Sequence, residues 1–361
     1  MKQSHFIGLG AHCQFTEMAV VNSRGEVVRR QRCPTTIPAL AELLGTVPRP
    51  CAVALGEGPL ADWLWRDLAP RVEQFAACDP RRNGLIAKDS DEDGPIDAAQ
   101  LAQLLRGGYL RAVHHPEALG RAVFRQWVLL YRGRVRQRAQ EANRVMAYLR
   151  RYGIFARERA FRDPGDRPGL AGRLPPEPLA AAHLQVLWQS YDPAAAQVRQ
   201  LRQRLTRQAA QEDVTRRWQE LPGIGWARAA SPFVFPDAPR RFPSKAALWK
   251  YLGAGLERRH SGPGPARVRV VRRSNRVLKG VIVGAAQRAI GQGANPFAER
   301  YRRWLKAGVP PGPARRNVAR ALAAAVWGMW KSGRAYHPEW VGAGAAAAAA
   351  RGGPPWAGPG A

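Results

Sequence analysis

The first 110 residues alternate between apolar runs of strand length and amphipathic segments of helix length, and this alternation limits the folds open to the chain. Two apolar runs, an Asn-Ser-Arg-Gly turn and a third run predict a three-stranded meander, after which helices and strands alternate. The predicted order, β-β-β-α-β-α-β-α, is typical of an α/β layered fold with a mixed sheet. The predicted strands are His5–Ala11, Thr16–Val21, Glu26–Arg32, Cys51–Leu55 and Val72–Cys78, and the predicted helices are Ile37–Leu44, Pro59–Leu68 and Pro95–Arg106.

Beyond this region the pattern changes to long arginine-rich helices. Residues 116–151 and Leu179–Leu221 have helical periodicity, and a Pro- and Gly-rich segment, residues 162–178, connects them. Two long helices joined by a loop predict a helical hairpin or coiled-coil arm. The predicted domains are an α/β domain (1–115), the helical arm (116–220), a mainly α C-terminal domain (221–340) and a disordered low-complexity tail (341–361).

Charge is distributed unevenly along the chain. Residues 1–120 hold 13 basic and 14 acidic side chains, a net charge of −1, whereas residues 121–361 hold 44 basic and 13 acidic, a net charge of +31. This excess favours a polyanionic partner over a typical small-molecule enzyme. Outside its alanine-rich tail, the sequence contains no apolar run of membrane-spanning length. It also contains no signal-peptide pattern and no Cys-x-x-Cys pair. We therefore expect a soluble cytoplasmic protein without membrane contact.

The scarce carboxylates of the first domain stand at positions suited to a metal ion. Glu57 follows the Cys51–Leu55 strand by one glycine, Asp97 lies in the first turn of the helix that begins at Pro95, and Asp93 belongs to an acidic run just before it. Several hard oxygen ligands from different elements are what Mg²⁺ requires for phosphodiester chemistry. The alternative is that Asp97 complements a helix dipole and that the acidic run is a solvated loop.

A Pro-Gly-Ile-Gly turn in the basic part of the chain contains Gly223 and Gly225. Such a turn before a helix of small residues is typical of the helix-hairpin-helix element, in which backbone amides approach a DNA phosphate at a helix N-terminus. The alternative is an ordinary turn between two helices.

A second basic segment surrounds Ser261. Guanidinium groups bind a scissile phosphate and stabilise the charge that develops on it, so a serine among them is a candidate nucleophile. The alternative is a loop serine without a catalytic role. Eight of the 22 residues from 258 to 279 are basic, namely Arg258, Arg259, Arg267, Arg269, Arg272, Arg273, Arg276 and Lys279.

Three stretches taken together resemble one family of insertion-sequence transposases. They are FIGLGAHCQFTEMAVV, then LIAKDSDEDGPIDAAQLAQLLRGGYLR, then LPGIGWARAASPFVFPDAPRRFPSKAALWKYLGAGLERRHSG, which continues into RRSNRVLKGVIVGAA. That family pairs an N-terminal DEDD domain with a C-terminal serine-bearing domain and comprises bridge-RNA-guided DNA recombinases. The resemblance implies an RNase H-like (Holliday-junction-resolvase-like) first domain, a coiled-coil middle and a helical C-terminal domain. It also implies a DNA-strand exchange in which a serine becomes linked to DNA beside Mg²⁺.

Carried over position by position, the resemblance makes Glu57 the family's second acidic residue, Asp97 its last, and Ser261 its nucleophile. We therefore expect a transposase that uses Mg²⁺. Its expected partners are insertion-element and target DNA, a structured non-coding (bridge) RNA, and further copies of the chain in a dimer or tetramer. Its expected location is the cytoplasm, in association with the nucleoid.

The chain departs from that family at two acidic positions. Gly10 stands on the first strand where the family has an Asp, and Gly94 stands three residues before Asp97, where the family has its third acidic residue. The neighbouring Asp93 is the remaining candidate ligand. Because glycine offers no side-chain oxygen, we expect an impaired recombinase. The alternatives are a degenerate copy that binds nucleic acid without cutting it, and a Mg²⁺-dependent junction nuclease that needs no serine.

Overall fold

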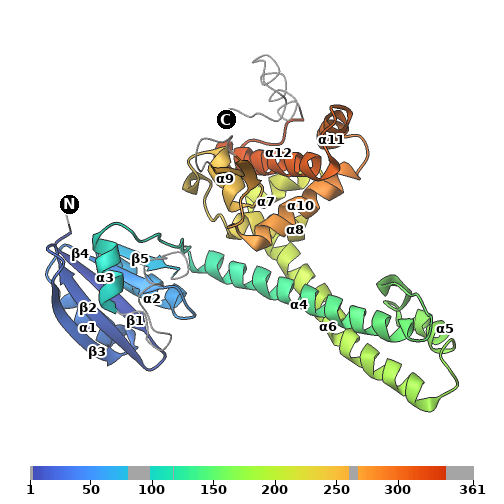
Figure 1. The fold of residues 1–361 in the computed structure, drawn as a ribbon, viewed down its shortest axis with the longest axis horizontal. Coiled ribbons are helices and arrows are strands. Elements are labelled where there is room, and N and C mark those ends of the chain that lie inside the picture. The colour runs from blue at the N-terminus through green and yellow to red at the C-terminus, as the bar shows by residue number, and fades with distance from the viewer. Residues whose placement is uncertain (1–2, 80–97, 117, 260–266, 339–361) are drawn as a thin grey trace. The chain divides into compact units, whose positions relative to one another are not determined.

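The computed structural model describes residues 3–79, 98–116, 118–259 and 267–338, and the chain divides into two compact units, Met1–Leu119 and Gly120–Ala361 (Figure 1). The first unit contains a mixed sheet of five strands in the order β3-β2-β1-β4-β5. The central strand β1 pairs antiparallel with β2 and parallel with β4. The elements are β1 His5–Ala11, β2 Phe15–Asn22, β3 Val27–Pro34, α1 Ile37–Gly45, β4 Cys51–Gly56, α2 Ala61–Leu68, β5 Gln74–Cys78 and α3 Ala98–Arg106.

The two faces of the sheet carry side chains of different size. On one face, large residues such as Leu9 pack against α1 and α2 in a buried core. On the other face, Ala52 and Ala54 pack against α3. A Cβ at Gly8 of β1 would lie 1.8 Å from the carbonyl oxygen of Ala98, the first described residue of α3. The absence of a side chain at Gly8 therefore allows the start of this helix to lie against the central strand.

The predicted α/β arrangement of this unit is confirmed. All five strands and all three helices are present in the predicted order, and within the described residues their ends differ from the predictions by at most two residues. Residues 95–97 of the third predicted helix lie outside the described residues. The RNase H-like assignment of the sheet stays a prediction.

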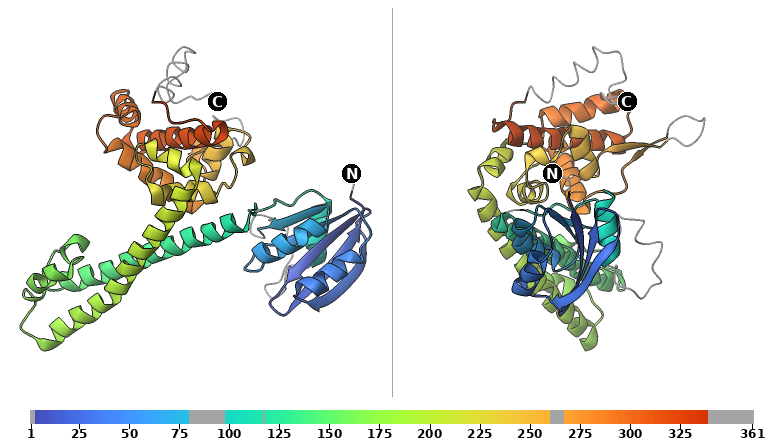
Figure 2. Two further views of the ribbon diagram at one scale, coloured as in Figure 1. Left: turned by 180° about the vertical axis from the view of Figure 1, so that it is seen from behind. Right: turned by 90° about the vertical axis from the view of Figure 1, so that its left-hand side faces the viewer.

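In its described residues, 120–259 and 267–338, the second unit contains helices and one short strand pair. No helix in the described part of the chain is long and apolar enough to cross a membrane. The helices of the second unit are α4 Leu119–Arg150, α5 Arg167–Ala171, α6 Pro178–Gln211, α7 Asp213–Arg217, α8 Trp226–Val234, α9 Lys245–Tyr251, α10 Arg276–Ile290, α11 Pro296–Lys306 and α12 Pro311–Ser332. Its strands, β6 Leu256–Arg259 and β7 Arg267–Val270, form an antiparallel hairpin that extends from the helices around it (Figure 2).

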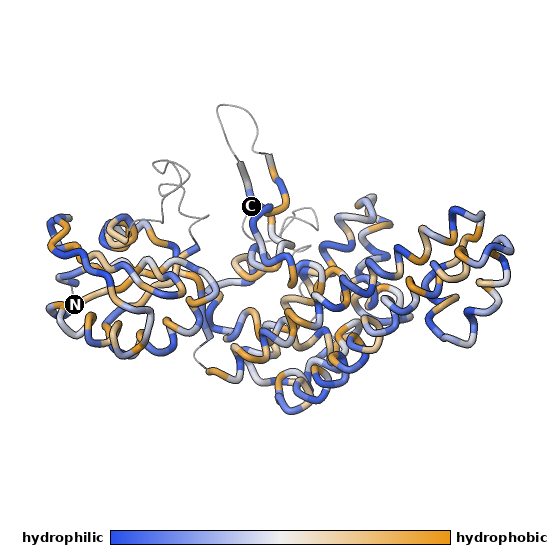
Figure 3. The backbone as a smooth tube through the Cα atoms, turned by 90° about the horizontal axis from the view of Figure 1, so that it is seen from below, coloured by the Kyte–Doolittle hydropathy of each residue, from blue (hydrophilic) through white to orange (hydrophobic). Residues whose placement is uncertain are grey.

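The long helices α4 and α6 form an antiparallel pair. Leu149 near the end of α4 shares a core with Leu184 near the start of α6. At the opposite ends of the same helices, Phe124 and Leu205 belong to the C-terminal core. Hydrophilic and hydrophobic residues alternate along both helices, as expected when one face packs and the other is solvated (Figure 3). The predicted helical hairpin is present, and its coiled-coil geometry stays a prediction.

The second long helix is shorter than its predicted extent of Leu179–Leu221. α6 ends at Gln211 because the backbone of Glu212 is extended, with φ −94° and ψ 119°. The hydroxyl of Thr215 donates a hydrogen bond to the carbonyl of Ala209, in the last turn of α6, and so stabilises this break. A new short helix, α7, then begins.

The C-terminal core is centred on Trp218. This indole is fully buried, and its N–H donates to the carbonyl oxygen of Val326 in α12 with an N···O distance of 3.1 Å. Residues of α8, α10 and α12 complete the core. Because the ends of α4 and α6 belong to the same core, the helical hairpin is anchored at one end.

Candidate functional site

The carboxyl ends of the parallel strands form the sheet edge at which Glu57 lies. Glu57 directly follows β4, and its amide donates to the carbonyl oxygen of Cys78, at the end of β5, with an N···O distance of 2.7 Å. This bond extends the β4–β5 pairing by one residue and fixes the backbone of Glu57. The Glu57 side chain is 35% exposed. Ligand sites in open α/β sheets form at this edge.

A buried histidine binds the Glu57 carboxylate. Nε2 of His115 lies 3.1 Å from Oε2 of Glu57, and Nδ1 lies 2.5 Å from Oδ1 of Asp62. The imidazole is 1% exposed and stacks on Trp65 with ring centroids 5.5 Å apart. A neutral imidazole can donate from only one nitrogen, so two carboxylate partners favour the doubly protonated ring.

The charge of His115 follows from two opposing effects. Burial lowers the pKa of His115, but hydrogen bonds to Glu57 and Asp62, together with their negative charge, raise it above its ordinary value. His115 therefore stays an imidazolium to higher pH than a solvated histidine does. Since Asp62 lies in the first turn of α2, this imidazolium ties the sheet edge to that helix and orients the carboxylate of Glu57.

Gly10 lies on the central strand beside this edge. The alternation of β1 places Gly10 on the same face as Gly8, which lies against Ala98. Ala98 directly follows Asp97, so the fold brings the start of α3 to the strand that carries Gly10. Asp97 and Asp93 themselves lie outside the described residues.

Glu57 is the one proposed Mg²⁺ ligand that the described part of the chain contains. It fits that role chemically, because it is a partly exposed carboxylate at the sheet edge with only one oxygen bound to His115. Within residues 3–79, 98–116, 118–259 and 267–338, no three His, Cys, Asp or Glu side chains form a group that could hold a metal ion. The Mg²⁺ site as a whole stays a prediction.

The two glycines of the turn before α8 differ in their surroundings. Gly223 has a φ of +84°, and a Cβ there would lie 2.2 Å from the carbonyl oxygen of Ala285 in α10. Its amide donates to Oε1 of Gln292 at 2.7 Å and is therefore engaged within the protein. Gly225 is the exposed N-cap of α8, and a Cβ there would meet nothing within 4 Å. Phosphate binding at this turn stays a prediction, and of the two glycines Gly225 is the accessible one.

The basic segment around Ser261 belongs to the β6–β7 hairpin and the start of α10. Ser261 lies in the connection between the two strands, which is outside the described residues, and the side chains of Arg258, Arg259 and Arg267 are not described. The other five basic side chains of the segment are exposed: Arg269, Arg272, Arg273, Arg276 and Lys279. Their exposure leaves them accessible to a polyanion.

The sequence pattern did not predict that His115 and Asp62 belong to this site. His115 is separated from Glu57 by 58 residues and from Asp62 by 53, so no local pattern joins them. Asp62 has the position of an ordinary first-turn acidic residue. The one local signal was the polar pair His114-His115, which stands near the end of the predicted α/β domain.

Comparison with known proteins gives two similarities, both to transposases. Residues 215–302 match the family described as the transposase IS116/IS110/IS902 family. A putative transposase of Sinorhizobium fredii (strain NBRC 101917 / NGR234), y4pF/y4sB, is 24% identical over 210 residues, which cover 56% of this chain and 53% of that protein. The chain thus matches about half the length of that relative.

Proposed function

We propose that this chain is the transposase of an insertion sequence, a DNA recombinase that cuts and rejoins strands through Ser261. The observation that carries the proposal is the match of residues 215–302 to a transposase family, because this stretch contains Ser261 and the exposed basic side chains that follow it. The similarity to a putative transposase over about half of each chain agrees with it.

The proposed chemical step is a substitution at phosphorus. The Oγ atom of Ser261 forms a bond to phosphorus while the bond from phosphorus to one deoxyribose oxygen breaks. The serine hydroxyl loses its proton, and the departing sugar oxygen gains one. Exposed guanidinium groups such as Arg272 and Arg273 supply positive charge for the phosphoryl oxygens. Because the serine ester keeps a phosphodiester linkage, a sugar hydroxyl of the new partner strand can reverse the step and rejoin DNA.

The proposed Mg²⁺ ligands are Glu57, Asp97 and Asp93. When bound, Mg²⁺ supplies Lewis-acid stabilisation of phosphate charge. His115 supports this role of Glu57, because an imidazolium on Oε2 fixes the carboxylate at the sheet edge. Gly10 contributes no carboxylate from the central strand, so we expect weak Mg²⁺ binding and slow cleavage by the unaltered chain.

The proposed partners follow from the family resemblance and the charge. The +31 net charge beyond residue 120 supports binding of insertion-element DNA, target DNA and a structured guide RNA in the nucleoid. The mixed five-stranded sheet, with an antiparallel meander leading into parallel strands, supports the RNase H-like assignment. Strand exchange between two DNA ends also suits a dimer or tetramer.

A second candidate function is nucleic-acid binding without cleavage. The observation that favours it is Gly10 on the central strand, where the resembled family carries a metal-binding Asp. This candidate keeps the basic surface and omits the serine chemistry.

Formation of a covalent adduct between protein and DNA separates the two candidates. The substrate is a labelled, nicked duplex carrying the DNA that flanks the gene, and the adduct is detected on a denaturing gel. We expect an adduct with the unaltered chain or with Gly10→Asp, and its loss on Ser261→Ala. Ser274→Ala, in the same basic segment, is the matched control. An adduct that survives Ser261→Ala contradicts Ser261 as nucleophile, and no adduct from any variant supports the binding-only candidate.

A further inference from the structure

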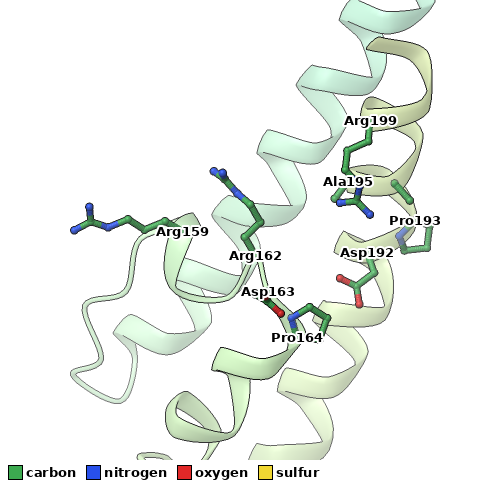
Figure 4. A pocket seen from close by; sticks show the side chains of 9 residues that line it. Arg159, Arg162, Asp163, Pro164, Asp192, Pro193, Ala195 and Arg199 are labelled. Atoms are coloured by element: carbon green, nitrogen blue, oxygen red, sulfur yellow. The ribbon is translucent and has the colours of Figure 1, made fainter. Parts of the chain in front are cut away.

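A cavity of about 720 Å³ lies between α6 and the segment that joins α4 to α6 (Figure 4). Arg159 and Arg162 line it from the joining segment, and Arg199 lines it from α6. Figure 4 shows Arg162 and Arg199 on opposite sides of the gap, while the Arg159 side chain extends outward. All three guanidinium-bearing residues are exposed.

The acidic residues of the cavity are already engaged. Asp192 receives a two-pronged contact from the buried Arg167, whose Nη1 lies 2.8 Å from Oδ2 and whose Nη2 donates to Oδ1. Oδ1 of Asp163 accepts the Gly165 amide at 3.1 Å as a local cap. Since Arg167 neutralises Asp192 from within the protein, the charge that the cavity offers to a ligand is positive.

The segment that carries two of the arginines is anchored. Phe161, between Arg159 and Arg162, is fully buried and packs edge-on to Tyr191 of α6 with ring centroids 5.4 Å apart. The Tyr191 hydroxyl donates to Oε1 of Glu158 at 2.9 Å. The backbone beneath the arginines is therefore held in place before any ligand arrives, which reduces the entropy lost on binding.

The helix on the opposite side is locally distorted. Pro193 lies inside α6 and lines the cavity, and a proline in this position cannot donate to the carbonyl four residues earlier. The ion pair of Asp192 with Arg167 and the backbone hydrogen bond that Pro193 cannot form therefore lie at adjacent residues of α6. Arg199 follows within two turns of this point.

The geometry points to a phosphodiester-binding site at this cavity: Arg162 and Arg199 hold two backbone phosphates of a bound nucleic acid, and Arg159 reaches a third. Guanidinium groups suit phosphate because their N–H groups form a planar fork that matches its oxygens. The site lies near the end of the helical hairpin away from the Trp218 core. This inference rests on the proposed function, since it requires nucleic acid as the partner.

The test is the salt dependence of binding by the full chain to a random-sequence DNA duplex and, separately, to an RNA hairpin. Arg162→Gln/Arg199→Gln removes the two cavity cations. Arg150→Gln/Arg207→Gln is the matched control, because it removes two exposed cations, one from α4 and one from α6, that lie outside the cavity lining. Arg162→Lys/Arg199→Lys tests whether charge alone restores binding.

We expect the cavity variant to lose about 1.4–1.8 units of the slope of log K against log salt, because each of two phosphate contacts contributes about 0.7–0.9 to the slope. The affinity near 0.1 M salt should fall about tenfold to a hundredfold. The control should lose much less, and the lysine variant should recover most of the slope. A loss confined to DNA or to RNA supports the site and identifies its ligand.

Three outcomes overturn the inference while leaving the proposed function intact. They are an unchanged slope in the cavity variant, an equal loss in the control, and a change only in self-association measured by sedimentation. If the unaltered chain binds neither probe, the proposed function fails as well, so the two failures are distinguishable.

Discussion

The two units of this chain use charge in opposite ways. In the first unit, net charge is −1 and the ring of His115 is buried between Glu57 and Asp62. In the second unit, net charge is +31, and exposed cations occur on the β6–β7 hairpin, on the long helices α4 and α6 and beside the cavity. Internal pairing orients a side chain, whereas exposed unpaired charge attracts a polyanion. We infer that the first unit contributes metal-site chemistry and the second contributes most nucleic-acid affinity.

The net charge of the second unit overstates its accessible binding groups. Nη1 of Arg121 donates to the carbonyl oxygens of Phe233 and Asp237, and burial lowers the pKa of Arg121. Nε of Arg320 donates to the carbonyl oxygen of Ala254, and burial lowers its pKa as well. Such arginines stabilise the helical core. The exposed arginines are the ones available to phosphate.

The largest expected effect concerns the separate cores of the two units. Trp218→Ala removes a fully buried indole and its hydrogen bond, so it should destabilise the second unit by about 3–5 kcal/mol. Leu55→Ala should destabilise the first unit by about 2–5 kcal/mol. Hydrogen exchange read by mass spectrometry should show faster exchange only in the unit that carries the substitution. Equal acceleration in both units by either variant would show that they unfold together.

The next effect concerns nucleic-acid affinity. Replacing Arg272, Arg273 and Arg276 of the second unit with glutamine should lower the slope of log K against log salt by about 2–2.7. Binding near 0.1 M salt should weaken by about two to three orders of magnitude. Replacing Arg24, Arg30 and Arg111, three exposed arginines of the first unit, with glutamine should change the slope by less than one unit. Equal losses would contradict the division of roles between the units.

A smaller effect compares the two glycines of the turn before α8. Gly223→Ala places a Cβ where φ is +84° and the Ala285 carbonyl is 2.2 Å away, so we expect a loss of about 2 kcal/mol or more. Gly225→Ala should cost less than about 1 kcal/mol, because its φ is −102° and nothing lies within 4 Å of its Cβ. Urea unfolding measures both. A reversed order would show that Gly223 is not required for packing on α10.

The smallest effect concerns the pH dependence of the first unit. Because the folded-state pKa of His115 is raised, its contribution to the free energy of unfolding is full at pH values below the ordinary histidine range and is lost as pH rises through the folded pKa. His115→Gln should therefore destabilise the first unit at pH 5.5 more than at pH 9. Metal-free denaturation curves at both pH values measure this, and equal losses would exclude a charged His115.

The sequence predicted the first unit better than the second for a physical reason. Its strands are mostly short apolar runs separated by turn residues, so their existence depends on local pattern. The end of α6 was missed because Thr215 stabilises it through a side chain that a helical pattern tolerates. The pairing of His115 with Glu57 was missed because it depends on the fold. The phosphate-contact role predicted for Gly223 took no account of its approach to α10.

The most direct test of our central claim is the Mg²⁺ dependence of adduct formation by the full chain, because the claim is that carboxylates of the first unit govern the serine chemistry of the second. We predict a low adduct yield from the unaltered chain. Gly10→Asp should raise the yield and lower the Mg²⁺ concentration that it requires. Gly10→Asp/Glu57→Gln should lose both improvements. The salt dependence of DNA binding should stay within one slope unit across these variants. A strong adduct from the unaltered chain that is indifferent to Mg²⁺ and to Glu57→Gln would contradict the claim.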